Sequence, residues 1–339
     1  MTVAILTFHN SPNNAGAVLQ AWALQRTIEK LEHEAVIIDY HRQRGDLVPW
    51  WSFKSLRQIY HTLKRVPWEA MRLRECDRFR RRHLNLVASQ FGGRIAYRDA
   101  DAYIVGSDQV LNPLHNEKSP DFLLDFAPSG KRRIAYGASF GTDKFDEDYR
   151  HLLGTSLPKF DALSVREMSG VETVRKVAGI AASVVLDPTL LLAPDEYTPL
   201  MSDALRRTPT VPYVFLYLVG SHPDARRIAL GKAKEVGATR IVVMTNSRAE
   251  WHWPQTGAFR RIHVFTPADF LSHISQAACV VTNSFHGTAF SLIFKRHFTS
   301  LRNGTAGDDR MATLLNAVAD GGLARFQSES MRFLQEALA

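Results

Sequence analysis

The sequence has little cysteine and no long apolar run. Cys76 and Cys279 are the only two cysteines among 339 residues, and they lie far apart. This excludes a disulfide framework and a cysteine-rich zinc site, and it indicates a reducing compartment. No apolar stretch approaches the ~20 residues that a membrane-spanning helix needs. Met1–Phe8 lacks a basic leader and predicts a core strand rather than a signal peptide. We therefore expect a cytoplasmic protein.

Signatures of metal and nucleotide binding are also scarce. The 13 histidines are scattered, and their spacing does not match a zinc site. No Gly-Lys-Ser/Thr phosphate loop occurs, and the loop Asn13–Gly16 lacks the glycine spacing of a dinucleotide fingerprint. These absences disfavour a zinc enzyme and a P-loop nucleotide hydrolase, and we expect no bound metal.

The positive charge is concentrated in one segment. The net charge is +8, and residues 42–83 hold twelve Lys or Arg against four acids, which equals the whole excess. The segment predicts one local basic surface rather than a protein coated with positive charge for nucleic acid. Aromatic residues interleave with the basic ones, which suits a membrane–water interface or an acidic glycan. An ordinary solvated helical face with tryptophan in the core fits equally well. The aromatic residues are Trp50, Trp51, Phe53, Tyr60, Trp68 and Phe79.

The remaining sequence alternates short apolar runs with helical periodicity. Two consecutive series of strands and helices, divided near Thr198–Pro212, predict an α/β protein with two doubly wound Rossmann-like domains facing a cleft. We place the domains at residues 1–205, with a basic helical insertion at about 45–95, and at residues 206–339. Predicted strands are 3–8, 35–39, 102–105, 134–138, 162–165, 183–186, 214–219, 239–245, 279–282 and 298–301. Predicted helices are 17–31, 224–236, one beginning at the capping box Thr266–Asp269, 287–295, 309–319 and 330–338.

The sharpest functional signal is the loop between a strand and a helix in Val280–Thr288. The first turn of a helix has unpaired N–H groups and a partial positive charge, which attract phosphate or carboxylate. Gly287 lets an anion approach the backbone, and His286 beside it can donate or take a proton near neutral pH. A helix start capped by Asn283 or Ser284, with a structural histidine, explains the pattern equally well.

Three further strand ends carry polar residues. Val105–Gln109 can contact sugar hydroxyls or cap a helix. Arg166 can bind both oxygens of a carboxylate or phosphate through its planar fork, or pair with Glu167 at the surface. Asp187 is typical of a turn residue.

Two arginines follow a later strand, Arg302 and Arg310, and either could reach the same site as His286. Asp309 is predicted to cap the helix that begins at Arg310. The early loop Asn13–Gly16 also precedes a helix and could touch a ligand.

Taken in order along the chain, these motifs resemble those of the polysaccharide pyruvyl transferase family. One departure is Ala15, where the family pattern usually has tyrosine or leucine. The matching segments are Asn14–Leu24, Val105–Pro113, Ala135–Gly141, Leu163–Glu167, Val185–Leu191 and Asn283–Ser291.

The resemblance implies an enzyme with a glycosyltransferase-B-like fold, phosphoenolpyruvate as donor substrate and no cofactor. Pyruvate would be placed on two hydroxyls of one sugar as a cyclic ketal, with release of phosphate. The acceptor would be a precursor of a surface polysaccharide or exopolysaccharide, often lipid-linked. We expect no nucleic acid partner, and peripheral contact with the inner face of the membrane would run through residues 42–83.

The resemblance also implies roles for individual residues. His286 would be the general acid, and Arg166 would act with it in catalysis on the donor. Related enzymes hold the donor with a lysine beyond the histidine helix, but residues 298–310 contain none, so Arg302 or Arg310 is the candidate replacement. The donor-binding residues would be Ser284, Gly287, Thr288, Arg302 and Arg310. The acceptor-binding residues would be Asn14, Gly16, Ser107, Asp108 and Gln109.

Two other functions fit parts of the sequence. One is a nucleotide-sugar glycosyltransferase of the same fold. Its retaining members usually carry two glutamates eight positions apart, and this chain has none between Glu250 and Glu329. The other is a non-catalytic protein that binds acidic glycan or nucleic acid through residues 42–83, with steeply salt-dependent binding in the case of nucleic acid.

Overall fold

The computed structural model describes residues 1–10, 14–41, 56–88, 90–91, 94–245, 257–304, 308–319 and 321–339. The predictions that involve residues 42–55, including Trp50, Trp51 and Phe53, lie outside the described residues. Tyr60 lies on a described helix whose side chains are not described before Pro67.

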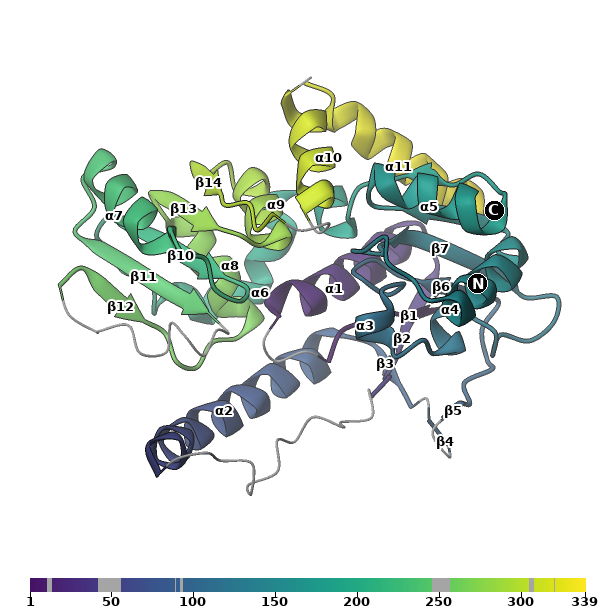
Figure 1. Cartoon of the computed structure of the whole chain (residues 1–339), viewed down its shortest axis with the longest axis horizontal. Coiled ribbons are helices and arrows are strands. Elements are labelled where there is room, and N and C mark those ends of the chain that lie inside the picture. Colours follow the sequence, from purple (N-terminus) through teal and green to yellow (C-terminus); the bar gives the residue numbers. More distant parts are fainter. Residues whose placement is uncertain are drawn as a thin grey trace.

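The first sheet contains, among the described residues, seven parallel strands in the order β3-β2-β1-β6-β7-β8-β9 (Figure 1). The chain builds outward from β1 to one side and then from β6 to the other, so its direction of growth reverses between these two strands. Ligands of such sheets bind beyond the carboxyl ends at the reversal. The strands are β1 Thr2–Leu6, β2 Glu34–Ile38, β3 Leu86–Val87, β6 Ala102–Val105, β7 Arg132–Ala138, β8 Ala162–Val165 and β9 Ser183–Val184.

The second sheet repeats this plan with the order β12-β11-β10-β13-β14, again with parallel pairing throughout. Its reversal lies between β10 and β13. Two such parallel sheets confirm the predicted α/β class and the pair of Rossmann-like units. The strands are β10 Tyr213–Leu218, β11 Arg240–Thr245, β12 Phe259–Arg261, β13 Cys279–Thr282 and β14 Phe298–Ser300. A separate two-stranded antiparallel sheet joins β4 Gln90–Phe91 to β5 Arg94–Ile95.

Helices connect the strands and cover the sheets. Helix α8 begins as predicted, because Thr266 and Asp269 form a capping box. In the described part of the chain, no helix is both long and apolar enough to cross a membrane. The helices are α1 Ala15–Lys30, α2 Leu56–His83, α3 Pro113–Asn116, α4 Glu147–Ser156, α5 Met168–Ala178, α6 Thr198–Leu205, α7 Ala225–Glu235, α8 Pro267–Gln276, α9 Phe285–Ile293, α10 Asp308–Ala319 and α11 Leu323–Leu338. Short 3₁₀ turns are η2 Pro120–Leu123, η3 Leu157–Lys159, η4 Pro188–Leu191 and η5 Pro194–Tyr197.

The last helix returns to the first sheet. Ser330 on α11 accepts a hydrogen bond from Leu186 N at 2.9 Å, and Arg132 at the start of β7 donates to Ala337 O at 3.0 Å. Figure 1 shows α11 running back beside α5 and β7. Residues 323–338 therefore pack against the first unit although they follow the second in sequence. The predicted division at residues 205 and 206 stays a prediction.

One apolar core joins the two units. Leu24 on α1, Phe270 on α8 and Phe290 on α9 are all fully buried members of the same cluster, which extends into both sheets. Tyr197 lies between the units and meets the Phe290 ring edge-on at 5.0 Å. Because burying aromatic and aliphatic surface is the main favourable contribution to folding, this shared core holds the strand ends of the two sheets near each other.

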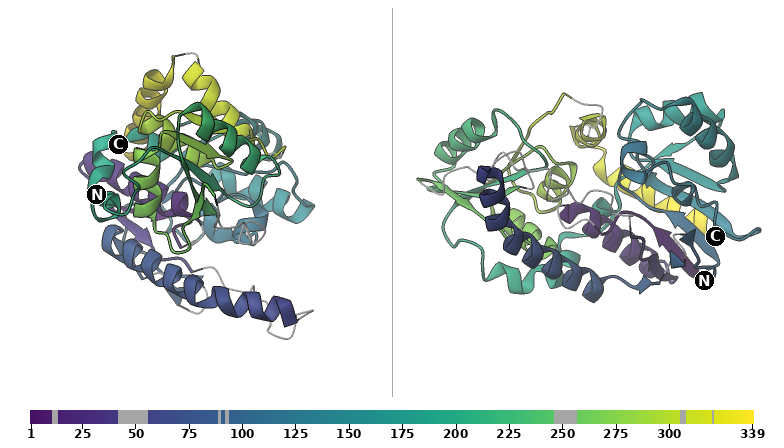
Figure 2. Two further views of the ribbon diagram at one scale, coloured as in Figure 1. Left: turned by 90° about the vertical axis from the view of Figure 1, so that its left-hand side faces the viewer. Right: turned by 60° about the horizontal axis from the view of Figure 1, so that its bottom comes forward.

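Helix α2 contacts both units along one side of the molecule (Figures 1 and 2). At its carboxyl end, Arg80 forms an ion pair with Asp39 after β2 and another with Asp77 at 2.6 Å. Further back along the helix, Cys76 Sγ lies 3.5 Å from Phe265 O, and the Arg72 guanidinium lies 5.3 Å from the Phe265 ring.

The structure restricts the predicted local basic surface to some of the arginines of this segment. Arg72 and Arg80 are buried, and they attach α2 to the body rather than facing solvent. The exposed cations of the described side chains are Arg74, Arg78, Arg81 and Arg82.

Replacing Arg80 tests this attachment. Arg80→Met keeps the apolar stem but removes the cation from between Asp39 and Asp77, so we expect a loss of about 2–4 kcal/mol in unfolding free energy. Arg81→Met is the matched control, because Arg81 pairs with the same Asp77 but is exposed and its pair is screened by solvent. Urea unfolding followed by circular dichroism measures both, and equal losses would contradict the buried role of Arg80.

His9 gives a pH signature to the same region. Its Nε2 donates to Ile38 O at 3.1 Å, and burial, with a smaller contribution from Arg80, lowers the pKa of His9 to about 4 from 6.5. The unfolded chain therefore binds more protons between these values, so stability falls as the pH drops from 6.5 to 4. The loss from this group reaches about 3 kcal/mol. In His9→Gln, the unfolding free energy should depend less on pH across this window, and an unchanged dependence would contradict the assignment.

Candidate functional site

The carboxyl ends of β1 and β6 are joined by side-chain hydrogen bonds at the first reversal. Thr7 Oγ1 donates to Ser107 O at 2.8 Å, and Gln20 on α1 donates to Thr7 Oγ1 at 2.9 Å. Gly106 makes this contact feasible, because a Cβ there would lie 3.1 Å from the Thr7 side chain. Ser107 is thereby fixed with its hydroxyl turned toward the neighbouring strand ends.

Asp187 stands at the centre of the side chains that follow these strands. It is fully buried, and its Oδ2 accepts from Ser107 Oγ at 2.8 Å and from Arg166 Nη1 at 2.6 Å. Its Oδ1 accepts from the Thr189 backbone N and hydroxyl at 3.1 and 2.7 Å. Asp187 therefore caps η4, as a turn residue would, and also holds the arginine predicted as catalytic.

Arg166 is buried, and only some of its N–H groups form hydrogen bonds with described residues. Its Nη1 also contacts Ser107 Oγ at 3.3 Å, and its guanidinium lies 4.5 Å from the centre of the Phe285 ring. Nε and Nη2 have no hydrogen-bond partner among the described residues, although Asp108 Oδ1 is 3.7 Å from Nη2. The Nε–Nη2 edge is the one that binds a carboxylate or phosphate with two parallel bonds. The alternative of a surface pair with Glu167 is wrong, since both residues are buried.

The second sheet has an equivalent link at its reversal. Asn283 after β13 accepts from Val219 N at 2.9 Å and donates to Val219 O at 3.0 Å, which joins the ends of β10 and β13. Ser284 caps α9 by accepting from Gly287 N at 3.4 Å. A Cβ at Gly287 would collide with the Thr282 side chain, so this glycine is required for close packing of the helix start. Of the two predicted caps, Ser284 serves α9.

His286, on the first turn of α9, reaches the residues of the first unit. A Cβ on Gly16 would overlap its imidazole ring, so the absence of a side chain at the start of α1 makes room for it. His286 Nε2 is buried, lies 3.6 Å from Asp187 Oδ2 and has no hydrogen-bond partner among the described residues. The predicted catalytic pair His286 and Arg166 thus meets at one carboxylate.

The electrostatics of Asp187 follow from this placement. Burial by itself would raise its pKa, but His286, Arg166 and the Thr189 hydroxyl hold the pKa of Asp187 well below its usual range. The carboxylate is therefore ionised at neutral pH and supplies a fixed negative charge between two cation-forming side chains.

The two candidate replacements for the family lysine differ in position. Arg310, on α10, lies with its Nη2 3.0 Å from the Gln109 amide in the orientation that turns the amide oxygen toward it. Burial and then the charge of Arg166 lower the pKa of Arg310 to about 10, which leaves it cationic at neutral pH. Arg302 is exposed, and its carbonyl lies 3.2 Å from His222 Nε2. Among the described residues, the Arg302 side chain makes no contact with this cluster.

The other predicted ligand-binding residues lie around the same point or support it. Asn14 is the N-cap residue of α1 without a side-chain capping bond, and Asp108 has a left-handed backbone (φ 76°) directly after Ser107. Thr288 Oγ1 lies 3.5 Å from Ser300 Oγ on β14. Asp309 accepts from Ser169 N at 3.1 Å, and α10 begins at Asp308, so the prediction that Asp309 caps a helix starting at Arg310 is wrong.

Two buried residues of the site were not predicted as functional. Glu167 Oε1 accepts from Ser139 Oγ at 3.0 Å and from Phe140 N at 2.9 Å, while its Oε2 is buried without a partner in the described residues. Gly137–Gly141 has the Gly-x-Ser-x-Gly spacing of a hydrolase nucleophile, a signal in the sequence that points to Ser139. Ser139 is fully buried and α4 begins only at Glu147, so it does not form a strand-to-helix nucleophile turn.

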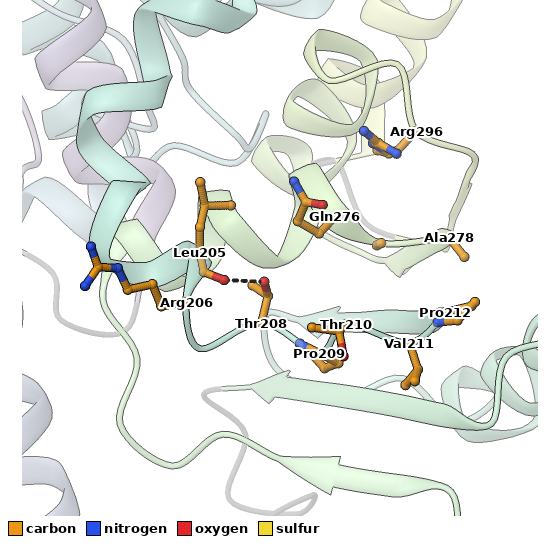
Figure 3. Close-up of a pocket in the computed structure, with 11 residues that line it drawn as sticks. Leu205, Arg206, Thr208, Pro209, Thr210, Val211, Pro212, Gln276, Ala278 and Arg296 are labelled. Atoms are coloured by element: carbon orange, nitrogen blue, oxygen red, sulfur yellow. Dashed lines mark hydrogen bonds between the residues drawn. The ribbon is translucent and has the colours of Figure 1, made fainter.

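A hollow of about 630 Å³ lies elsewhere, at the amino ends of β10 and β13 (Figure 3). Arg206 and Arg296 line it, but both are exposed, and the side chains drawn there include no acid, histidine or cysteine. Across the described residues, no group of three or more His, Cys, Asp or Glu side chains is placed to hold a metal ion. The cluster around Asp187 is therefore the candidate site.

Solved structures share the fold at low sequence identity. UDP-N-acetylglucosamine 2-epimerase from Neisseria meningitidis, bound to UDP-GlcNAc, aligns with a TM-score of 0.51 and 11% identity over 100% of this chain and 99% of that one. The corresponding epimerase from Rickettsia bellii gives 0.49 at 12% identity over 99% and 96%. The wall teichoic acid polymerase TagF gives 0.48 at 11% over 98% and 83%. The likeness to the Neisseria meningitidis structure concerns the fold alone, which is of the glycosyltransferase-B type.

The family assignment comes from the sequence. No curated protein matches the chain. The profile of the family described as polysaccharide pyruvyl transferase matches residues 14–305, which include Gly16, Ser107, Arg166, Asp187 and His286. The match covers most of the chain, and the chain belongs to the polysaccharide pyruvyl transferase family of enzymes.

Proposed function

We propose that this enzyme transfers the enolpyruvyl group of phosphoenolpyruvate to two hydroxyls of one sugar in a surface polysaccharide or exopolysaccharide precursor. The product is a cyclic pyruvate ketal, and inorganic phosphate is released. The observation that carries the proposal is the Nε–Nη2 edge of buried Arg166, which has no hydrogen-bond partner among the described residues and lies in the same cluster as His286 and Arg310.

Phosphoenolpyruvate matches this cluster in charge. Its carboxylate and phosphate are both anionic, and each needs a desolvated cation or a set of N–H donors. Arg166 offers two parallel N–H groups, Arg310 a second guanidinium, and the first turn of α9 at Gly287 and Thr288 the positive end of a helix. Ser284 already uses one of these N–H groups as the cap, so the helix start acts mainly through its field.

The chemistry needs a proton at the methylene carbon of the donor. His286 Nε2 is buried, forms no hydrogen bond within the described part of the chain and lies 3.6 Å from the Asp187 carboxylate, which suits a group that delivers this proton. Protonation makes a methyl group and leaves a cation at C2, which one sugar hydroxyl attacks. Phosphate then departs, and the second hydroxyl closes the ring.

The proton balance closes without a cofactor. Each of the two hydroxyls loses one proton. One of these replaces the proton that was added to the methylene carbon, and the other leaves with the phosphate. Asp108 and Gln109 lie at the carboxyl end of β6, beside the cations, and are our candidates for binding the sugar hydroxyls together with Asn14 and Gly16. Carboxylate and amide groups are suited to hydroxyls, because they accept the hydrogen bonds that hydroxyls donate.

The outward face of α2 favours an acceptor at a membrane surface. Trp68 and Met71 are 44% and 51% exposed, and Arg74, Arg78 and Arg82 follow at helical spacing. Large apolar side chains beside arginines suit the boundary between anionic head groups and acyl chains. We propose that this face brings the enzyme to a lipid-linked acceptor.

Phosphate release tests the proposed reaction. With phosphoenolpyruvate and lipid-linked glycans from lysate, the wild-type enzyme should release phosphate only when acceptor is present. His286→Ala should lower the rate by about 10²–10⁴-fold, because it removes the general acid. Arg166→Ala and Arg310→Ala should raise the KM for phosphoenolpyruvate, because each removes a cation. Arg302→Ala is the matched control, since that side chain is exposed and should leave KM unchanged.

Thermal shift supplies the independent arm. Phosphoenolpyruvate should raise the Tm of the wild type and of His286→Ala but not of Arg166→Ala. Absence of phosphate release together with a Tm increase from nucleotide sugars alone would overturn the proposal in favour of a glycosyltransferase.

Vesicle binding tests the α2 face. Neutralising Arg74, Arg78 and Arg82 to glutamine should weaken binding to anionic vesicles by about 3 kcal/mol, roughly 10²-fold, at about 1 kcal/mol per charge. Neutralising the three exposed cations of α7, Arg226, Arg227 and Lys234, removes the same charge from another face and should leave binding nearly unchanged. Equal losses in the two triple variants would show that net charge, not α2, governs binding.

A further inference from the structure

Asp187 contacts residues from three different strand ends. Ser107 follows β6, Arg166 follows β8, and His286 follows β13 in the other sheet. All these contacts converge on one oxygen, Oδ2, while Oδ1 is occupied by Thr189. The carboxylate is thus a point at which both sheets meet.

The backbone on either side of Asp187 is held independently of this cluster. Leu186 N donates to Ser330 Oγ on α11 at 2.9 Å, and Tyr136 Oη on β7 donates to Leu186 O at 3.2 Å. Tyr197 Oη, at the end of η5, donates to Thr189 O at 2.7 Å. The backbone at Asp187 is therefore held in place by contacts outside the cluster, and Arg166 and His286 can be oriented by its carboxylate.

We propose that Asp187 is a positioning residue, which holds the guanidinium of Arg166 and stabilises the imidazolium form of His286 across the junction of the two sheets. Its Oδ2 engages Nη1 of Arg166 and so leaves the Nε–Nη2 edge, which has no hydrogen-bond partner among the described residues, available to bind an anion. The same oxygen lies 3.6 Å from His286 Nε2, where a negative charge favours the protonated ring.

The other groups around His286 do not replace this effect. Arg166 and Arg310 bring positive charge from β8 and α10, and Asp108 and Glu167 bring negative charge after β6 and β8. Gly16 on α1 and Phe285 on α9 are uncharged. Of the carboxylates in the described part of the chain, Asp187 is the one that lies within ion-pair distance of the imidazole. Without the Asp187 charge, Asp108 and Glu167 would still offset the two arginines, but His286 would lose its nearest negative charge.

Asp187→Asn tests the proposal, because asparagine keeps the size of the side chain and removes the charge. The readout is a pH titration of the imidazole resonances in protein labelled with ¹⁵N-histidine, with His286 assigned by comparison with His286→Gln. The midpoint for His286 should fall by about one pH unit or more, a tenfold change in the ratio of imidazolium to imidazole. This readout needs no substrate and stands apart from the proposed function.

Asp108→Asn is the matched control. It removes the same charge from the same cluster, but from a carboxylate that faces Arg166 rather than His286, so its shift should be clearly smaller. Equal shifts in both variants, or no shift in folded Asp187→Asn, would overturn the proposal.

A second variant covers the case in which Asp187→Asn does not fold. Ser107→Ala removes one donor from Oδ2 and leaves more of its charge for His286, so the midpoint should move in the opposite direction, to higher pH. A shift to lower pH, or none, would count against Asp187 as the counter-charge.

The activity arm rests on the proposed function. In the phosphate-release assay, the alkaline limb of the pH profile should move to lower pH in Asp187→Asn, with kcat falling by about 10²-fold. A purely structural role would lower the rate equally at every pH. If the wild type releases no phosphate, the proposed function fails, while the titration still decides the role of Asp187.

Discussion

A fully buried carboxylate can remain charged only if its surroundings supply cations and hydrogen-bond donors, and Asp187 has both. Ser107, Arg166 and Thr189 satisfy its two oxygens, and His286 lies beside Oδ2. The requirement runs in both directions, since Arg166 would be an equally costly buried cation without Asp187. The positions of the strand ends of both sheets are thus linked by the need to solvate one charge.

Packing makes this electrostatic arrangement persistent. The core that runs from α1 through α8 to α9 keeps the start of α1 and the start of α9 close enough for Gly16 to touch the His286 ring. Closely packed interiors resist small displacements, so the distances between the side chains around Asp187 depend largely on apolar residues of this core. Helix α2, with Arg80 at one unit and Cys76 at the other, adds a second connection on the outer side.

The sequence predicted much of this site because parallel sheets place the ends of their strands at one edge. The segments after β6, β8 and β9 could therefore be expected at one edge of the first sheet, and the segment after β13 at the corresponding edge of the second. Motif order identified His286 and Arg166 as a pair. Residue type could not reveal that Asp187 joins them, since a turn aspartate before proline is common and its second role depends on side chains distant in sequence.

Other features depend on tertiary packing in the same way. Glu167 is buried, although a glutamate after an exposed-looking arginine gives no sign of this. Arg80 belongs to a basic run, yet it is the member that pairs inward with Asp39. Which of Arg302 and Arg310 lies near the cluster depends on the path of the chain after β14, and local sequence patterns do not specify that path.

The last two helices belong to the folded structure although the family match ends before them. The family match ends at residue 305, whereas Arg310 and the whole of α11 follow it. A chain cut at that point would lose the Arg310 guanidinium from the cluster around Asp187 and would uncover the side of the first unit that Ser330 and Ala337 contact. An exchange of the second half between relatives would therefore also exchange helix α11, which packs against the first unit.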